Sequence, residues 1–443
     1  MMKYCIYSAK ARNKTQKNYF APSYLRAFVL FICLLNGVLL QSQVQYNQAF
    51  DQNIKTIQIK LNDVNFTNPV FSLNGEDVLY FSFDELSHDA KSYSYKIQHC
   101  NANWTLSNIS EFEYVDGINL VDIFDYRQSI NTTVLYTHYE FQIPNEYITP
   151  KISGNYIVSV FESDNPDAVS FTARFCVVEQ QAVNINAVVK TNTDIGVRTN
   201  FQQVEFDVTT RNYQIQDPFS ELNVYIRQNG RIDNEVTGIK PTFLSGNKLT
   251  YSNNRAMIFD AGNEYRSLDI SNIRILDDNV SSIKFFEPFY HVEMFGDKPR
   301  NNKPYSDKKD VNGRFVINLQ RSMYEISTQA DYLFVHFSLL MDSPFFDGSV
   351  HLVGGFNSQY INNQTRMQYL NSSKNYQQTL LLKQGGYNYM YLFVPKGSTK
   401  GSTRQIEGDF WQTENEYEIF IYHRQQGSRY DRLIGYRLFN SRN

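Results

Sequence analysis

The sequence of 443 residues contains little that an enzyme, a metalloprotein or a membrane-spanning protein would need. It has four cysteines, twelve prolines and two tryptophans, and no apolar run after residue 42 is long enough for a transmembrane helix. It contains no Gly-x-Ser-x-Gly, no Gly-x-x-x-x-Gly-Lys and no dinucleotide fingerprint. These absences argue against hydrolase, NTPase and dehydrogenase chemistry, and leave open only an enzyme with a site of another kind.

Metal ligands and catalytic carboxylates are equally sparse. His99 and Cys100 are adjacent, so on a strand they point to opposite faces and cannot easily bind one ion together, although His138 could come near either. The closely spaced acidic pairs lie in loop-like places, where surface solvation explains them: Asp84 with Glu85, Asp122 with Asp125, and Asp277 with Asp278. The sequence therefore predicts no catalytic residue, no metal site and no cofactor.

The first 42 residues have the layout of an export signal. They contain six Lys and Arg residues and no acidic residue, and an apolar run starts at Ala27. A basic segment followed by a short apolar one is typical of a secretory signal peptide, so we expect residues 1–42 to be removed on export. The charge of the remaining chain is then −3 − 6 = −9. This acidic balance argues against nucleic acid as a partner.

Two cysteines, Cys100 and Cys176, remain after the expected signal peptide. Both lie in strand-like segments of the same predicted domain. An exported protein could join them in a disulfide, or they could be two buried thiols, and the sequence alone leaves both alternatives open.

Period-two alternation of apolar residues runs through the whole chain, and 33 Phe and 32 Tyr residues favour strands. Examples are Leu79, Phe81 and Phe83, or Tyr156, Val158 and Val160, with turn signals such as Asn74-Gly75 between the runs. We predict an all-β protein of two or three consecutive antiparallel β-sandwich (immunoglobulin-like) domains. The expected boundaries are 43–180, 181–325 and 326–443.

The last predicted domain resembles the immunoglobulin-like module of glycogen-binding proteins. Residues 350–357 read VHLVGGFN, and residues 380–391 read LLLKQGGYNYMY. Such modules share a Gly-Phe-Asn corner and a strand that ends in Gly-x-Tyr-x-Tyr. The tryptophan usual after the corner is absent, and Tyr360 is the nearest aromatic residue. The resemblance implies the fold, and it makes a carbohydrate-binding cell-envelope protein the alternative function.

The first predicted domain resembles the plug-protein family of the type IX secretion system of Bacteroidota. Residues 95–104 read YKIQHCNANW, close to the Ile-Gln-His-Cys-Asn-Ala-Asp-Trp stretch of that family. Segments 113–117, 131–139 and 153–156 follow in the family's order, and residues 429–436 match near the end of the chain. Asn103 in place of Asp, like Leu106 in place of Pro, is a departure that we interpret as loop variation.

This resemblance implies a function. Plugs of this family lie in the periplasm and close the periplasmic opening of the large outer-membrane β-barrel translocon. We therefore expect a non-enzymatic periplasmic plug that is peripheral to the outer membrane through its partner. The interface or family-motif residues that the resemblance suggests are Asn101, Trp104, Tyr114, Gly117 and Tyr139. Core positions are the other interpretation of Trp104, Tyr114 and Tyr139, and a turn position that of Gly117.

Overall fold

The computed structural model describes residues 44–191, 196, 198–210, 213–320 and 325–442. The predicted signal peptide, residues 1–42, lies outside the described residues. The all-β prediction is confirmed, because the described chain consists of mostly antiparallel sheets with a few short helices, including α2 (Glu111–Tyr114), α3 (Pro218–Glu221) and α4 (Ile326–Gln329). No described helix has the length and apolar character that crossing a bilayer demands.

Two sheets pack face to face to form the first sandwich. The larger sheet has the order β1 (Gln48–Ala49), β12 (Val169–Val178), β11 (Gly154–Glu162), β5 (Tyr93–Cys100) and β7 (Val121–Ile123), with β3 (Val70–Ser72) parallel to β12. The smaller sheet has the order β2 (Ile54–Leu61), β4 (Leu79–Glu85), β9 (Thr137–Ile143) and β8 (Asp125–Gln128). The alternating apolar residues of both sheets fill one core. A short ribbon of β6 (Val115–Gly117) and β10 (Ile148–Pro150) lies beside it.

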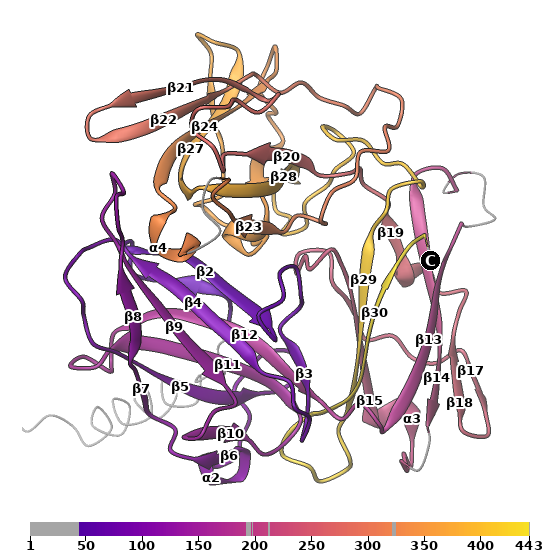
Figure 1. Cartoon of the computed structure of the whole chain (residues 1–443). Helices are drawn as coiled ribbons and strands as arrows, with labels where there is room; N and C mark the ends of the chain where they lie inside the picture. Colours follow the sequence, from indigo (N-terminus) through magenta and orange to yellow (C-terminus); the bar gives the residue numbers. More distant parts are fainter. Residues whose placement is uncertain (1–43, 192–195, 197, 211–212, 321–324, 443) are drawn as a thin grey trace, which may run out of the picture. The chain divides into compact units, whose positions relative to one another are not determined.

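The second sandwich combines a middle segment of the chain with its end. One sheet has the order β13 (Val183–Lys190), β14 (Phe201–Thr210), β18 (Lys248–Tyr251) and β17 (Phe243–Ser245), with β19 (Ile258–Asp260) also on β14. The facing sheet has the order β16 (Val236–Thr237), β15 (Leu222–Gln228), β29 (Glu416–His423) and β30 (Arg432–Asn440). Figure 1 shows the yellow strands β29 and β30 beside β15.

The third sandwich lies between these segments in sequence. One sheet places β28 (Gly385–Pro395) beside β20 (Arg266–Asp269), β23 (Phe315–Ile317) and β25 (Gly348–Val353). The other has the order β21 (Val280–Phe286), β22 (Phe289–Met294), β24 (Tyr332–Leu340), β27 (Asn375–Lys383) and β26 (Gln368–Leu370). Apolar side chains from both sheets share a core.

Strand pairing does not follow the division expected at residues 325 and 326. β22 lies before that point and pairs in parallel with β24 after it, and β29 and β30 return to β15 of the middle segment. Long-range pairing of this kind depends on which strands meet in space, and local alternation carries no information about it.

The two cysteines are free thiols. Cys100 on β5 and Cys176 on β12 both align with Asn155 on β11, which lies between them. Two strand spacings amount to roughly 9–10 Å, beyond the reach of a disulfide at about 7 Å between Cα atoms. Burial raises the pKa of both thiols to about 12, so both are unreactive core groups.

Candidate functional site: a buried charge cluster and an adjoining cleft

A cluster of charged groups lies where the first sandwich contacts the third. Asp84 on β4 is fully buried and accepts three bonds from different elements. His138, its direct neighbour on β9, approaches Asp84 Oδ1 with Nδ1 at 2.5 Å. Lys383 Nζ and the Tyr332 hydroxyl, both from the third sandwich, each lie 2.6 Å from Asp84 Oδ2. One carboxylate therefore ties strands that are about 300 residues apart in sequence.

Tyr136 and Asp331 extend the same junction, which we call the Asp84 cluster. The Tyr136 hydroxyl donates to the carbonyl of Ala330 at 2.8 Å, and the Lys383 ammonium lies 4.1 Å above the Tyr136 ring. Asp331 accepts hydrogen bonds from the backbone N–H groups of Thr133 and Val134 at 2.8 and 3.1 Å. The polar groups of the junction are thus paired with one another across the two sandwiches, as buried charges must be.

The ionisation of the Asp84 cluster follows from these contacts. Burial alone would raise the pKa of Asp84, but Lys383 and His138 outweigh it and hold that pKa below its usual value. Burial would lower the pKa of His138, but its bonds to Asp84 and Glu140 raise it. The pKa of Lys383 is lowered, because burial outweighs its attraction to Asp84. The cluster therefore contains a carboxylate and a histidine that favour their charged forms.

The sequence interpretation of Asp84 and Glu85 as surface groups in a loop is wrong. Both residues end strand β4 and are buried. Asp84 points away from the core of the first sandwich, on the face that the third sandwich covers, so local sequence gives no sign of its burial. Lys383 and Tyr332, its partners, carry no motif that could have revealed them.

The Asp84 cluster predicts a pH dependence of stability. Because the pKa of His138 is raised on folding, its contribution is complete below the unfolded value of about 6.5 and is lost as the pH rises through the folded value. We expect the difference in free energy of unfolding between the parent protein and His138→Gln to shrink by about 1–2 kcal/mol between about pH 6 and pH 9. Urea unfolding at each pH, followed by circular dichroism, measures this difference in free energy. His88→Gln, at an exposed histidine outside the Asp84 cluster, serves as the control.

A row of stacked side chains leads from the Trp104 motif to a cleft. The Arg174 guanidinium lies 4.2 Å above the Trp104 ring and 4.9 Å from the ring of Tyr46. Tyr46 in turn packs against Tyr360 with ring centroids 4.9 Å apart. Tyr360 lines the cleft, so Trp104 packs, through Arg174 and Tyr46, behind one wall of the cleft.

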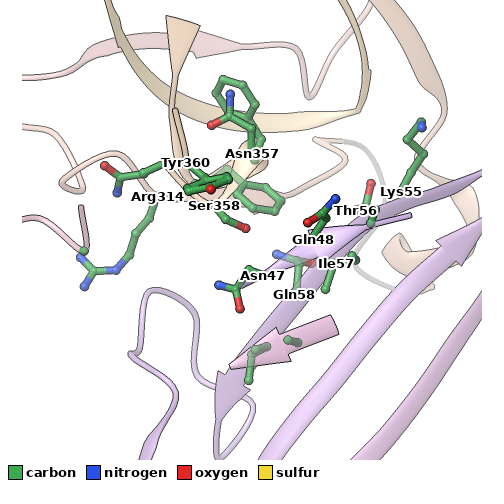
Figure 2. Close-up of a pocket in the computed structure, with 18 of the residues that line it drawn as sticks. Asn47, Gln48, Lys55, Thr56, Ile57, Gln58, Arg314, Asn357, Ser358 and Tyr360 are labelled. Carbon is green, nitrogen blue, oxygen red and sulfur yellow. The ribbon is translucent and has the colours of Figure 1, made fainter. Parts of the chain in front are cut away.

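The cleft has a volume of about 800 Å³ and lies between the first and third sandwiches. Figure 2 shows residues of β2 on one side and the corner at Asn357 and Tyr360 on the other. Its lining is rich in amide side chains, such as Asn47, Gln48 and Gln58. A concave space of this size, with both polar and apolar side chains in its lining, is suited to holding a ligand of several residues or rings. The Gly-Phe-Asn corner that resembles glycogen-binding modules forms part of this wall.

The five sequence-predicted site residues lie in the interior or at turns of the first sandwich. Trp104 is 6% exposed, and the side chains of Tyr114 and Tyr139 are also buried. Asn101 lies at the turn after β5, where its carbonyl accepts from Asn155 Nδ2 at 3.0 Å. Gly117 has φ +97°, and a Cβ there would lie 2.0 Å from the carbonyl oxygen of Tyr147. The structure does not bring these residues together at one surface.

His99 and His138, considered above as metal ligands, have other partners. His99 is held between the Ser107 hydroxyl at 2.9 Å and the Ser153 carbonyl at 3.2 Å, and burial lowers its pKa to about 4. In the described part of the chain, no group of three or more His, Cys, Asp or Glu side chains is arranged to hold a metal ion. The fold and the site define a multi-sandwich β protein whose buried charges join its sandwiches to one another.

Comparisons with known proteins give the family. The family described as "Type 9 secretion system plug protein 1st domain" matches residues 54–179. A crystal structure of a hypothetical protein from Parabacteroides merdae is 40% identical, with a TM-score of 0.88, and the match covers 90% of this chain and 100% of that one. No curated protein matches the chain. The chain belongs to the type 9 secretion system plug protein family, as its motifs predicted.

Proposed function

We propose that this protein is a non-enzymatic plug that works in the periplasm and closes the periplasmic opening of the type IX translocon barrel. Membership of the plug family is the observation that carries the proposal. The Asp84 cluster supports it, since a stopper must keep its shape under load, and buried paired charges resist separation of the sandwiches they join. The large barrel of the outer membrane is the partner.

Exposed apolar side chains suggest which face contacts the barrel. They concentrate between residues 112 and 147 of the first sandwich, and the most exposed are Phe112 at 75% and Phe124 at 74%. Ile118 and Tyr147, two of these exposed residues, are neighbours, because the Ile118 N–H donates to the Tyr147 carbonyl at 2.8 Å. Exposed aromatic groups of this kind are typical anchors of protein interfaces. We call this surface the Phe112 face.

Two charge-introducing substitutions test the proposal. We expect Phe112→Asp and Phe124→Asp to weaken recovery of the barrel protein with the tagged plug from envelope extracts by about tenfold or more, because a buried carboxylate at the interface would lack a partner. Phe346→Asp is the matched control, since Phe346 is 89% exposed but lies in the third sandwich. Thermal melting of each variant checks that the fold is intact.

The same strains report on closure of the barrel. If the plug seals the opening, cells that contain the barrel but lack the plug should admit large antibiotics, and the two Phe112-face variants should behave similarly. Unchanged permeability in the plug-free strain, with the barrel confirmed in the membrane, would contradict the proposed function. Equal barrel recovery by all three variants would contradict only the choice of face.

A further inference from the structure

Strand β2 has a free edge along the cleft. It pairs with β4 on one side and with no described strand on the other. The Asn62 N–H bonds the Val78 carbonyl, so even-numbered residues at this end of β2 face β4. Leu61 instead donates to Thr67 Oγ1 at 2.8 Å and accepts from the Val64 N–H, so it faces the free edge. By the two-residue period, the N–H and C=O of Ile59 face the same way.

The backbone groups of Ile59 have no partner among the described residues. Ile59 and Phe81 on β4 form a non-hydrogen-bonded pair of the antiparallel ladder. No described loop residue bonds to the backbone of Ile59 either. Just before it the strand carries a bulge, with Thr56 at φ +52° and a register shift between Lys55 and Gln58. Bulges of this type occur at sheet edges and beside functional sites. The unpaired N–H and C=O of Ile59 can each bond to a peptide group of another strand.

The side chains around this edge suit a polypeptide backbone. The amides of Gln48 and Gln58 line the cleft and have no hydrogen bond to any described residue, so both can bond to a peptide group. Lys55 and Lys60 lie along this edge of the cleft, and Lys60 is 3.4 Å from the exposed Asp63. Arg314 also lines the cleft but is ion-paired with Glu416. The two lysine ammonium groups can pair with acidic side chains of a ligand.

The opposite wall limits what can enter. It is formed by Thr379–Leu382 of β27 and by the corner that includes Phe356 and Tyr360, so the edge faces a second surface across the cleft (Figure 2). A single extended strand fits such a space. The lining residues Ile54 to Lys60 span roughly 20 Å, the length of about six extended residues.

We propose that the free edge of β2 binds an extended segment of another polypeptide, about six residues long and carrying acidic side chains near its ends. The segment adds to the sheet as a strand through the backbone of Ile59. Its carboxylates lie near Lys55 and Lys60, and its alternate side chains contact the aromatic wall. This site is separate from the Phe112 face and does not depend on docking to the barrel.

The probe is a fluorescein-labelled heptapeptide of sequence Glu-Val-Thr-Val-Thr-Val-Glu, titrated against the full exported chain by fluorescence polarisation. We expect saturable binding, and slower hydrogen exchange at the Ile59 amide when the peptide is bound. The amide of Lys60 faces β4 and is already paired, so its exchange should not change. The same peptide with proline at its centre should bind more weakly, because it lacks one N–H.

A matched pair of variants isolates the backbone group. Ile59→Ala and Ile59→Pro both shorten the same partly buried side chain, but only the proline removes the outward N–H, in a position where an edge strand tolerates it. We expect Ile59→Pro to weaken peptide binding about tenfold relative to Ile59→Ala, the effect of one hydrogen bond. If Ile59→Pro does not fold, the exchange measurement on the parent protein decides.

Three results would overturn the proposal. The first is peptide binding that leaves exchange at the Ile59 amide unchanged. The second is binding of maltoheptaose in the cleft with no binding of the peptide, which would assign the space to a carbohydrate. The third is a concentration-dependent dimer that Ile59→Pro abolishes, which would assign the edge to a second copy of this chain. None of these results bears on barrel closure, so the two proposals can fail separately.

Discussion

Asp84→Asn is expected to lower the free energy of unfolding by about 3–5 kcal/mol, the cost of breaking a buried ion pair from one side. The amide has the shape of the carboxylate but no charge. Lys383, whose side chain is 1% exposed, would then be left as a buried ammonium without a counter-ion, and His138 would lose its closest partner. Urea unfolding followed by circular dichroism measures the loss.

Two further variants show whether the charge is responsible. In the double variant Asp84→Asn with Lys383→Met neither buried charge remains, so we expect it to recover a large part of the lost stability. Asp125→Asn, whose parent side chain on β8 is 63% exposed, should change stability by less than about 0.5 kcal/mol. A loss below about 1 kcal/mol for Asp84→Asn would show that the Asp84 cluster does not hold the sandwiches together.

Trp104→Ala is also expected to lower the free energy of unfolding, by about 3–5 kcal/mol. The indole fills a cluster with Val70, Ile157 and Leu433, which joins the first sandwich to the second, and Arg174 stacks on it. Removing it leaves a cavity beneath a largely buried guanidinium. Calorimetry or circular dichroism is the measurement, because fluorescence would change with the loss of the indole itself.

The second tryptophan of the chain provides the control. Trp411 is 45% exposed, and its hydrogen bonds to Thr199 and Gln202 use backbone atoms that alanine retains. Trp411→Ala should therefore change stability by less than about 1 kcal/mol. If Trp104→Ala instead kept full stability but lost the barrel, Trp104 would be an interface residue and the packing role would be wrong.

Local sequence was enough to predict the strands and the family. The alternation of Leu79, Phe81 and Phe83 became strand β4, and all three side chains are buried in the first core. The motif around His99 and Trp104 matched the family, and in this chain its residues are committed to packing and to hydrogen bonds inside the fold. Gly117 belongs to the same class, since its positive φ and its close approach to Tyr147 exclude a side chain.

The candidate site could not be predicted in the same way. Alternation distinguishes the core face of a strand from its other face, but it does not say whether that other face meets water. Asp84 and Gln58 both lie on the face of their strand that points away from the core. Asp84 is buried as a counter-ion, whereas Gln58 lines a cleft. The difference depends on β24 and β27, which arrive from the third sandwich.

The sequence by itself determined the strand content, the core-facing side chains, the turn glycines and the family, because each depends on spacing within a few residues. The tertiary structure decided which strands share a sheet, that the chain ends in the second sandwich, and that Asp84 meets Lys383. It also decided that β2 keeps one edge open to a cleft. These features depend on contacts between residues tens to hundreds of positions apart, which form only when whole sheets pack.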